Sequence, residues 1–221
     1  MHNGSAIKVV CFDLGGVVVR ICRTWDEGCA AAGLPVRDPE KRAATKDARR
    51  GLIAQFQTGR IDGAAFAHRI SQSMDGLYSP DEILAVHHAW IRGEYDGIIG
   101  IVDELHSAGI ATATLSNTNH EHWSQMVTAP AVQRIRHLLA SHLLGLHKPE
   151  PEVFRAAESH LNARPHEILF FDDLQQNVDA ARTCGWIAEP IDPRKETAPQ
   201  IRRVLSKHRA LRGDEANAGF E

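Results

Sequence analysis

A chain of 221 residues is long enough for one substantial domain, or for a core domain with a smaller insertion, and it can bury a real hydrophobic core. Its formal net charge is −3 and 6% of its residues are aromatic, so nothing indicates the strongly positive surface that nucleic acid or an anionic membrane requires. We therefore expect a small-molecule partner, with no nucleic acid and no membrane.

The four cysteines form no C-x-x-C pair, which argues against a zinc knuckle or a thioredoxin-like redox motif. Reduced thiols in a cytoplasmic protein are the simplest account of them. The N-terminus has no basic segment followed by an apolar run and a cleavage site, and charged residues interrupt the apolar stretch 7–22. We therefore predict a cytoplasmic protein without an export signal or a membrane span.

The first predicted strand covers residues 7–12, a short apolar run rich in β-branched side chains that ends at Asp13 and a glycine turn. From residue 18 to residue 95 the pattern is helical and almost free of strand-like runs. Within it, Ser79 and Glu82 have the spacing of a helix capping box. This segment is predicted to be a helical insertion.

Strands and helices alternate in the rest of the chain. Predicted strands lie at 110–115, within 138–144, at 168–171 and at 186–191, and predicted helices start at Asp96 and cover 153–161 and 177–184. This alternation indicates βαβ units and predicts an α/β fold with a Rossmann-like, three-layered parallel sheet. The expected division is a core of residues 1–17 and 96–212, a helical domain of residues 18–95, and a disordered tail of residues 213–221.

Polar residues follow three of the predicted strands. Asp13 comes after the first strand, Ser116 and Asn117 after the second, and Asp172 and Asp173 after the strand at 168–171. In a parallel sheet, ligands bind beyond the carboxyl ends of the strands. The sequence therefore predicts that these clusters converge on one site.

Four segments, taken in order, resemble the four motifs of the haloacid dehalogenase-like superfamily. They are F-D-L-G-G-V (residues 12–17), L-S-N-T (115–118), H-K-P-E-P (147–151) and F-F-D-D-L-Q-Q-N (170–177). The resemblance covers nearly the whole chain. It is strongest to the subfamily that inserts a helical cap between the first and second motifs, which implies that residues 18–95 form such a cap.

The resemblance implies that Asp13 is a nucleophile that forms an aspartyl-phosphate, which divides one difficult hydrolysis into two easier transfers. Attack by a carboxylate on a phosphate dianion needs positive charge, which Mg²⁺ and the catalytic, substrate-binding Lys148 would supply. Ser116, also catalytic, and the backbone around Asn117 would donate hydrogen bonds to the phosphate oxygens.

The same resemblance implies a set of metal ligands. The hard ion Mg²⁺ prefers oxygen, and its protein ligands would be Asp13, the backbone carbonyl of Gly15 and Asp172. Asp173 and Asn177 match neighbouring positions of the fourth motif and are expected to support the metal site. His120 and His122 lie two residues apart on a predicted helix and would face different directions, so a solvated or capping role is expected for them.

One position departs from the usual pattern. Phosphatases of this superfamily carry a second aspartate two positions after the nucleophile, which protonates the leaving group and later activates water, and here that position is Gly15. General acid–base help is worth roughly 10²- to 10⁴-fold, so its loss should slow the turnover of esters with poor leaving groups. Water, His68 of the cap, or the substrate itself could replace the missing acid.

The leading hypothesis is a Mg²⁺-dependent hydrolase acting on a small phosphomonoester, such as a sugar phosphate. A second hypothesis is carbon–halogen cleavage on the same aspartate, where a leaving halide needs no proton. A third is a protein that binds a phosphorylated metabolite with little turnover. The residues leave open whether the chain is a monomer or a homodimer.

Overall fold

The structure is a computed structural model that describes residues 7–211, so the predicted tail at residues 213–221 lies outside the described residues. Its centre is a sheet of five parallel strands in the order β5-β4-β1-β6-β7. The strands are β1 (Val9–Phe12), β4 (Ala111–Ser116), β5 (His137–Ala140), β6 (Ile168–Asp172) and β7 (Ile187–Pro190). The predicted α/β fold with a parallel sheet is confirmed.

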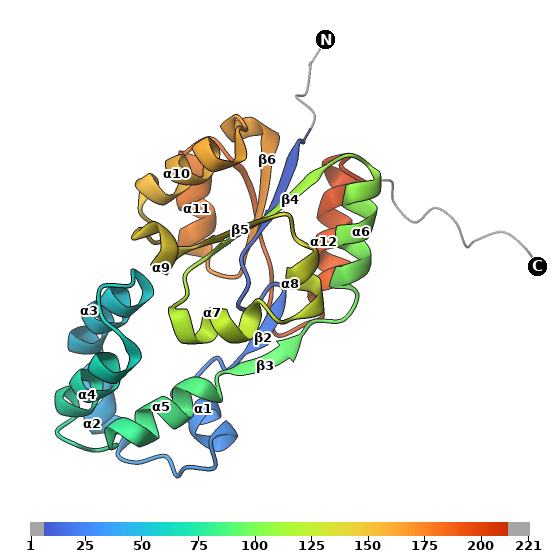
Figure 1. Cartoon of the computed structure of the whole chain (residues 1–221). Helices are drawn as coiled ribbons and strands as arrows, with labels where there is room; N and C mark the ends of the chain where they lie inside the picture. The colour runs from blue at the N-terminus through green and yellow to red at the C-terminus, as the bar shows by residue number, and fades with distance from the viewer. Residues whose placement is uncertain (1–6, 212–221) are drawn as a thin grey trace, which may run out of the picture.

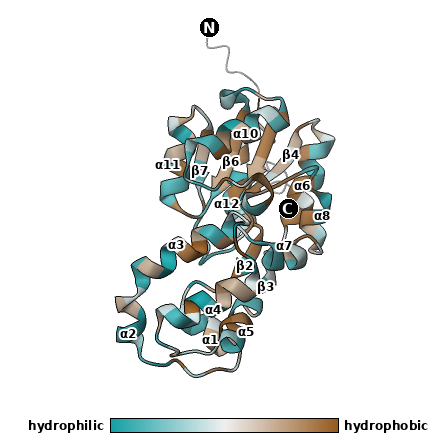
Figure 2. Cartoon of the chain, turned by 60° about the vertical axis from the view of Figure 1, so that its left-hand side comes forward, coloured by the Kyte–Doolittle hydropathy of each residue, from teal (hydrophilic) through white to brown (hydrophobic). Residues whose placement is uncertain are grey.

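Helices cover both faces of the sheet, which gives three layers (Figure 1). One face carries α6 (Ile98–Ser107), α8 (Pro130–Arg134) and α12 (Thr197–Lys207), and the other carries α10 (Pro151–Leu161) and α11 (Gln175–Thr183). Shorter elements are α7 (His120–Met126), α9 (Ser141–Leu144) and a 3-10 turn, η1 (Pro165–Glu167). Apolar residues concentrate along the strands and on the inner sides of these helices (Figure 2).

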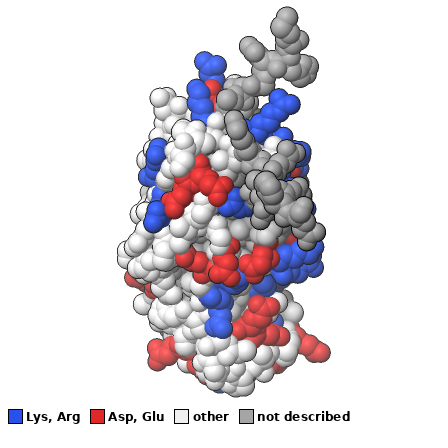
Figure 3. Space-filling model, turned by 90° about the vertical axis from the view of Figure 1, so that its right-hand side faces the viewer, with Lys and Arg blue, Asp and Glu red and all other residues white. Residues whose placement is uncertain are grey.

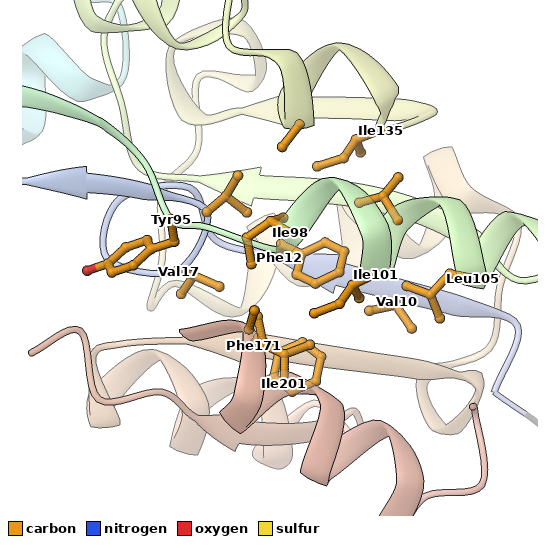
Figure 4. Close-up of a cluster of buried hydrophobic side chains, with 14 of the residues drawn as sticks. Val10, Phe12, Val17, Tyr95, Ile98, Ile101, Leu105, Ile135, Phe171 and Ile201 are labelled. Carbon is orange, nitrogen blue, oxygen red and sulfur yellow. The ribbon is translucent and has the colours of Figure 1, made fainter. Parts of the chain in front are cut away.

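The central strand β1 explains why its sequence is an unbroken apolar run. Successive side chains of a strand point to opposite faces. Val10 and Phe12 pack into the cluster under α6 and α12 (Figure 4), whereas Val9 and Cys11 pack into the cluster under α10 and α11. Both faces of β1 are therefore buried, and no position on it tolerates solvent.

A third hydrophobic cluster lies outside the sheet. It is formed by α1 (Trp25–Ala31), α3 (Lys46–Gln57), α4 (Gly63–Ser73) and α5 (Pro80–His88), whereas α2 (Pro39–Ala44) contributes no buried residue to it. We call residues 25–88 the helical lobe. Phe56, Phe66 and Tyr78 are buried within it, and the capping box of Ser79 and Glu82 forms at the start of α5 as predicted.

The prediction of residues 18–95 as almost free of strands is wrong at both ends of that segment. There, β2 (Val19–Ile21) and β3 (Ile91–Glu94) pair antiparallel and connect the helical lobe to the sheet domain. Sequence patterns could not reveal them because each strand is short and β3 reads I-R-G-E, with one apolar residue in four.

No helix within residues 7–211 is long and apolar enough to cross a membrane. On the face of the described chain that Figure 3 shows, patches of acidic and basic side chains alternate.

Candidate active site

The three central strands bring the predicted motif residues to one edge of the sheet. Asp13 follows β1, while Ser116 and Asp172 are the last residues of β4 and β6, the two strands that flank β1. Phe12 pairs with Thr114 on one side and with Phe171 on the other, so the three strands end at nearly the same height. Asp13, Ser116 and Asp172 are all buried, as expected for a site set into the sheet edge.

Lys148 lies between the two aspartates. It comes from the segment just before α10, and its Nζ atom is 3.2 Å from Oδ1 of Asp13 and 2.6 Å from Oδ2 of Asp172. The side chain is fully buried, with Nζ 5.2 Å from the centre of the Phe170 ring. A lysine is rarely buried this deeply unless opposite charges hold it, and both carboxylates do so here. The peptide bond between Lys148 and Pro149 is cis.

The environment of Asp13 opposes its negative charge. Burial, together with the nearby carboxylates of Asp172 and Asp173, raises the pKa of Asp13 to about 7, although Lys148 acts to lower it. Burial alone would lower the pKa of Lys148, but Asp13 and Asp172 outweigh it and the pKa is raised. The lysine is therefore charged at neutral pH, and additional positive charge would keep Asp13 ionised. The backbone N–H of Leu14 donates a hydrogen bond to Asp13.

Three carboxylates form a candidate cation site. Asp13, Asp172 and Asp173 each offer an oxygen, and these atoms lie within 4.8 Å of one another. The side-chain amide of Asn177 donates to both oxygens of Asp172, at 3.0 and 3.1 Å, and fixes the plane of that carboxylate. Oδ1 of Asn177 is buried without a hydrogen-bond partner among the described residues. A cluster of carboxylate and amide oxygens has the donor chemistry of a Mg²⁺ site.

The structure places Asn117 beside Lys148. Its side-chain amide donates to the carbonyl of Lys148 at 2.7 Å and accepts from the N–H of Lys148 at 2.8 Å. Both the nitrogen and the oxygen of the Asn117 side chain are thus engaged in joining the second motif to the third. Only the backbone of Asn117 is left for the expected contact with substrate.

The turn after Asp13 shows what fills the position of the missing acid. A side chain at Gly15 would place its Cβ atom 3.0 Å from Cδ1 of Ile21, a tight contact with an apolar group that would have to move aside. His68, one of the candidate replacements, is exposed on α4, where its ring contacts Gln72 of the same helix. Gly16 has a φ of +84°, a left-handed conformation that glycine adopts without strain.

Sequence reasoning missed Arg23. It lies between β2 and α1, and its guanidinium is 2.5 Å from Oδ2 of Asp173. A single arginine after a short strand carries no local signal, so only the fold reveals this contact across the chain.

The expectation of a solvated or capping role is wrong for His122. This residue is half-buried and stacks on His87 of α5, with the ring centres 3.7 Å apart, whereas His120 is exposed.

Comparison with known proteins agrees with this architecture. Residues 7–185 match the family of haloacid dehalogenase-like hydrolases. The chain is 25% identical over 219 residues to the phosphatase MT3486 of Mycobacterium tuberculosis, covering 93% of this chain and 97% of that protein. It is 26% identical over 195 residues to a D-ribitol-5-phosphate phosphatase of Bacteroides thetaiotaomicron, covering 81% of this chain and 89% of that protein.

A solved structure with a similar fold is that of a haloacid dehalogenase family enzyme from Bacteroides thetaiotaomicron in complex with magnesium. It superimposes with a TM-score of 0.73 at 24% identity, over 90% of this chain and 100% of that chain. Some curated relatives are much longer, and the chain spans 19% of the acyl-CoA dehydrogenase family member 10 of Mus musculus, to which it is 23% identical. Because the family match extends over most of the chain and includes all four motif segments, the chain belongs to the haloacid dehalogenase-like hydrolases.

Proposed function

We propose that this hydrolase is a Mg²⁺-dependent phosphatase that cleaves a small phosphomonoester through an aspartyl-phosphate on Asp13. The phosphatases among its relatives support the reaction class, and the magnesium complex of a structural neighbour supports the choice of metal. We take a sugar or polyol phosphate as the first substrate class to test, because one of these relatives acts on D-ribitol 5-phosphate.

The observation that carries the proposal is the position of Asp13 beside a buried, charged lysine and two further carboxylates. Asp13 Oδ1 lies 3.2 Å from Lys148 Nζ, and Asp172 and Asp173 complete an acidic cluster. Lys148 and Arg23 supply two positive charges against three carboxylates, so the site with Asp13 ionised has one negative charge too many. A divalent cation would reverse that sign and let the site accept a phosphate dianion.

In the first step, an oxygen of the Asp13 carboxylate attacks phosphorus, and the bond between phosphorus and the ester oxygen breaks. Lys148 would hold the phosphate oxygens while charge develops on them, and the Ser116 hydroxyl would donate a hydrogen bond to one of them. The leaving oxygen takes a proton to become an alcohol. In the second step, water attacks phosphorus, inorganic phosphate leaves, and the carboxylate of Asp13 is restored.

Asp13, the Gly15 carbonyl and Asp172 would hold the Mg²⁺ ion. When bound, the ion supplies Lewis-acid charge that offsets repulsion between Asp13 and the phosphate dianion. Asn177 and the N–H of Leu174 keep the Asp172 carboxylate oriented toward the cluster, with the Leu174 bond at 2.8 Å. Leu14 does the same for Asp13 through its N–H, at 2.7 Å.

Residues 18–95 would act as a cap that closes over the carboxyl edge of the sheet, excludes water and selects the substrate. Contacts between the lobe and the sheet domain support this placement: the Ser141 hydroxyl lies 2.5 Å from the Gln57 carbonyl at the end of α3. With Ile21 filling the space beside Gly15, the leaving group would have to obtain its proton from water or from the substrate's own hydroxyl groups.

The test is a steady-state assay of the purified chain with Mg²⁺, comparing p-nitrophenyl phosphate with a panel of sugar and polyol phosphates. Asp13→Asn serves as the control because it keeps the shape of the side chain and removes the nucleophile. Hydrolysis that depends on both Mg²⁺ and Asp13 supports the proposal. If no ester is hydrolysed while 2-chloropropionate releases chloride, the chain is a dehalogenase, and if phosphate binds without any turnover it is a binding protein.

A further inference from the structure

The ion pair of Arg23 with Asp173 connects the start of the helical lobe to the candidate metal site. Arg23 belongs to the three residues between β2 and α1, and its Nη1 atom lies 2.5 Å from Oδ2 of Asp173. The Asp173 side chain is 4% exposed and the Arg23 side chain is 35% exposed, so the carboxylate is buried and the guanidinium closes over it. Asp173 is one of the three carboxylates of the cation cluster.

Gly16 shows that the turn is shaped around this pair. A Cβ atom on Gly16 would lie 2.7 Å from Oδ2 of Asp173 and 2.9 Å from Nη1 of Arg23, closer than real contacts allow. The pair therefore lies directly against the backbone of the turn that begins at Asp13. Two independent requirements, a positive φ and the space for this pair, both demand glycine at position 16.

No other cation takes the place of Arg23 in this part of the described structure. A cavity of about 530 Å³ is lined by Arg23, Asp173 and Arg194. The guanidinium of Arg194 is bound to Asp192, at 2.9 and 3.1 Å. Arg20, three residues before Arg23, is directed elsewhere: its guanidinium contacts Glu196 at 2.5 Å and lies over the ring of Tyr95.

We propose that Arg23 is a positioning residue that limits the metal site to the ligands Asp13, Gly15 and Asp172, by holding the carboxylate of Asp173 in an ion pair. The inference rests on the Mg²⁺ site of the proposed function and concerns which carboxylates that site uses. The ion pair of Arg23 and Asp173, with 2.5 Å between its charged atoms, has no net charge. Asp173 therefore attracts a nearby cation much less than an unpaired carboxylate would.

The pair also sets the charge that a substrate meets. With Arg23 in place, the cluster of Asp13, Asp172, Asp173 and Lys148 plus one divalent cation carries a net positive charge, which attracts a phosphate dianion. Without Arg23 the same cluster is neutral, so the metal would bind more tightly and the substrate less tightly. Arg23 therefore exchanges some metal affinity for phosphate affinity, and it does so from the segment that leads into the lobe.

The test measures the affinity for Mg²⁺ by isothermal titration calorimetry, in which MgCl₂ alone is titrated into the metal-free chain. Arg23→Gln is expected to bind Mg²⁺ about tenfold more tightly than the wild type, because a positive charge is lost near the ion and Asp173 is released. Arg23→Lys restores the charge and is expected to return the affinity to within about threefold of the wild type. Arg20→Gln is the matched control, with the same charge change three residues earlier, in β2, and should leave the affinity unchanged.

The double variant Arg23→Gln, Asp173→Asn decides whether Asp173 is a ligand. It removes both charges of the pair and replaces them with two amides of similar size, so it is expected to fold and to bind Mg²⁺ within about threefold of the wild type. A loss of tenfold or more in the double variant would show that Asp173 coordinates the ion directly, and the proposal would be wrong. It would equally be wrong if Arg23→Gln bound Mg²⁺ no more tightly than Arg20→Gln.

These outcomes are separate from those of the phosphatase assay. If the wild type binds Mg²⁺ with the predicted dependence on Arg23 but hydrolyses no ester, the proposed function fails and the role of Arg23 stands. If esters are hydrolysed but Arg23→Gln binds Mg²⁺ with the affinity of the wild type, the proposed role of Arg23 is wrong and the proposed function stands. A wild-type chain that binds no Mg²⁺ overturns both.

Discussion

The side chain of Asn117 and the backbone of Lys148 are joined by two hydrogen bonds, one donated in each direction, at 2.7 and 2.8 Å. Asn117 follows β4 directly, so this contact fixes the third motif relative to the end of a central strand. The charged end of Lys148 is thereby held at a constant place between Asp13 and Asp172.

We predict that Asn117→Asp weakens catalysis through this contact. The variant keeps an acceptor for the N–H of Lys148, loses the donor to its carbonyl, and should destabilise the fold by about 1–3 kcal/mol because a buried acceptor is left unpaired. The turnover number should fall more than KM rises, since the position of Lys148 matters most in the transition state. Kinetics and chemical unfolding of the same preparation test this. An unchanged turnover number would mean that Lys148 needs no such support.

A second prediction concerns the stability of the metal-free chain. The pKa of Asp13 is raised to about 7, above the value of about 3.9 for an unfolded aspartate, so its ionisation opposes folding. The stability associated with Asp13 is therefore present at low pH and is lost as the pH rises from about 4 to about 7. Asp13→Asn should unfold at a higher temperature than the wild type at pH 8, with a gain of up to about 4 kcal/mol that disappears near pH 4.

The control for this measurement is Asp81→Asn, which changes an exposed aspartate at the start of α5. It should show no comparable gain at pH 8. A wild-type chain that is as stable as Asp13→Asn throughout this pH range would show that Lys148 fully compensates the buried charge of Asp13.

The third prediction concerns the missing acid. Turnover should depend steeply on the leaving group, with p-nitrophenyl phosphate favoured over alkyl phosphates. Gly15→Asp alone should be destabilising because its Cβ atom would lie 3.0 Å from Ile21. Gly15→Asp combined with Ile21→Ala removes that clash, and should raise alkyl phosphate turnover at least about tenfold, by supplying general acid–base help. If the double variant is folded and shows no such gain, the chain already has another acid.

A fourth prediction follows from the stacked pair of His87 and His122. The Nε2 atom of His122 contacts the His87 carbonyl, and the Nε2 atom of His87 contacts Oδ1 of Asn119 at 3.2 Å. Both acceptors are oxygens without a proton, so both rings carry a proton on Nε2. Burial, together with the second ring, lowers the pKa of His87 to about 3, and burial lowers that of His122 to about 4.

The groups facing this pair cannot stabilise two positive charges. Phe56 of α3 and Phe66 of α4 present rings to His87, His88 adds a third imidazole, and Glu121 is the one carboxylate described near the pair, with Oε2 3.8 Å from Nε2 of His87. A histidine with a lowered pKa contributes stability that is present above about pH 6.5 and is lost as the pH falls toward the folded pKa.

We therefore expect the chain to lose about 2 kcal/mol of stability through His87 between pH 6.5 and pH 5. His87→Phe can pack against Phe56 and Phe66 and should reduce this acid sensitivity, whereas the exposed His68→Gln should not change it. Chemical unfolding at several pH values between 5 and 7.5, using all three proteins, measures the difference. Equal acid sensitivity in the wild type and His87→Phe would contradict the account.

The sequence was sufficient where local pattern and global fold agree. The run 9–12 is buried on both faces and ends at Asp13, and the same logic placed Ser116 and Asp172 at neighbouring strand ends. Sequence reasoning could not find contacts between residues that are ordinary in their own surroundings. Arg23 is one case, because its partner Asp173 is 150 positions away and the residues next to Arg23 in the sequence match no motif.

The contacts of the Asn117 side chain could not be predicted from the sequence for a related reason. Its position in the second motif suggested a phosphate contact, and only the arrangement of β4 beside the loop at Lys148 shows that its side chain is already engaged. The short pair β2 and β3 was missed because three or four residues with mixed polarity give no clear period.

The most direct test of the central claim is to look for phosphorus on Asp13 itself. The chain would be mixed with Mg²⁺ and p-nitrophenyl phosphate, quenched in acid within the first turnovers, digested, and analysed by peptide mass spectrometry. We predict a phosphoryl group on the peptide that contains Asp13, accumulating because Gly15 provides no base to speed its hydrolysis, and absent in Asp13→Asn. Release of inorganic phosphate at full rate by Asp13→Asn, with no phosphorylated peptide in the wild type, would contradict the account.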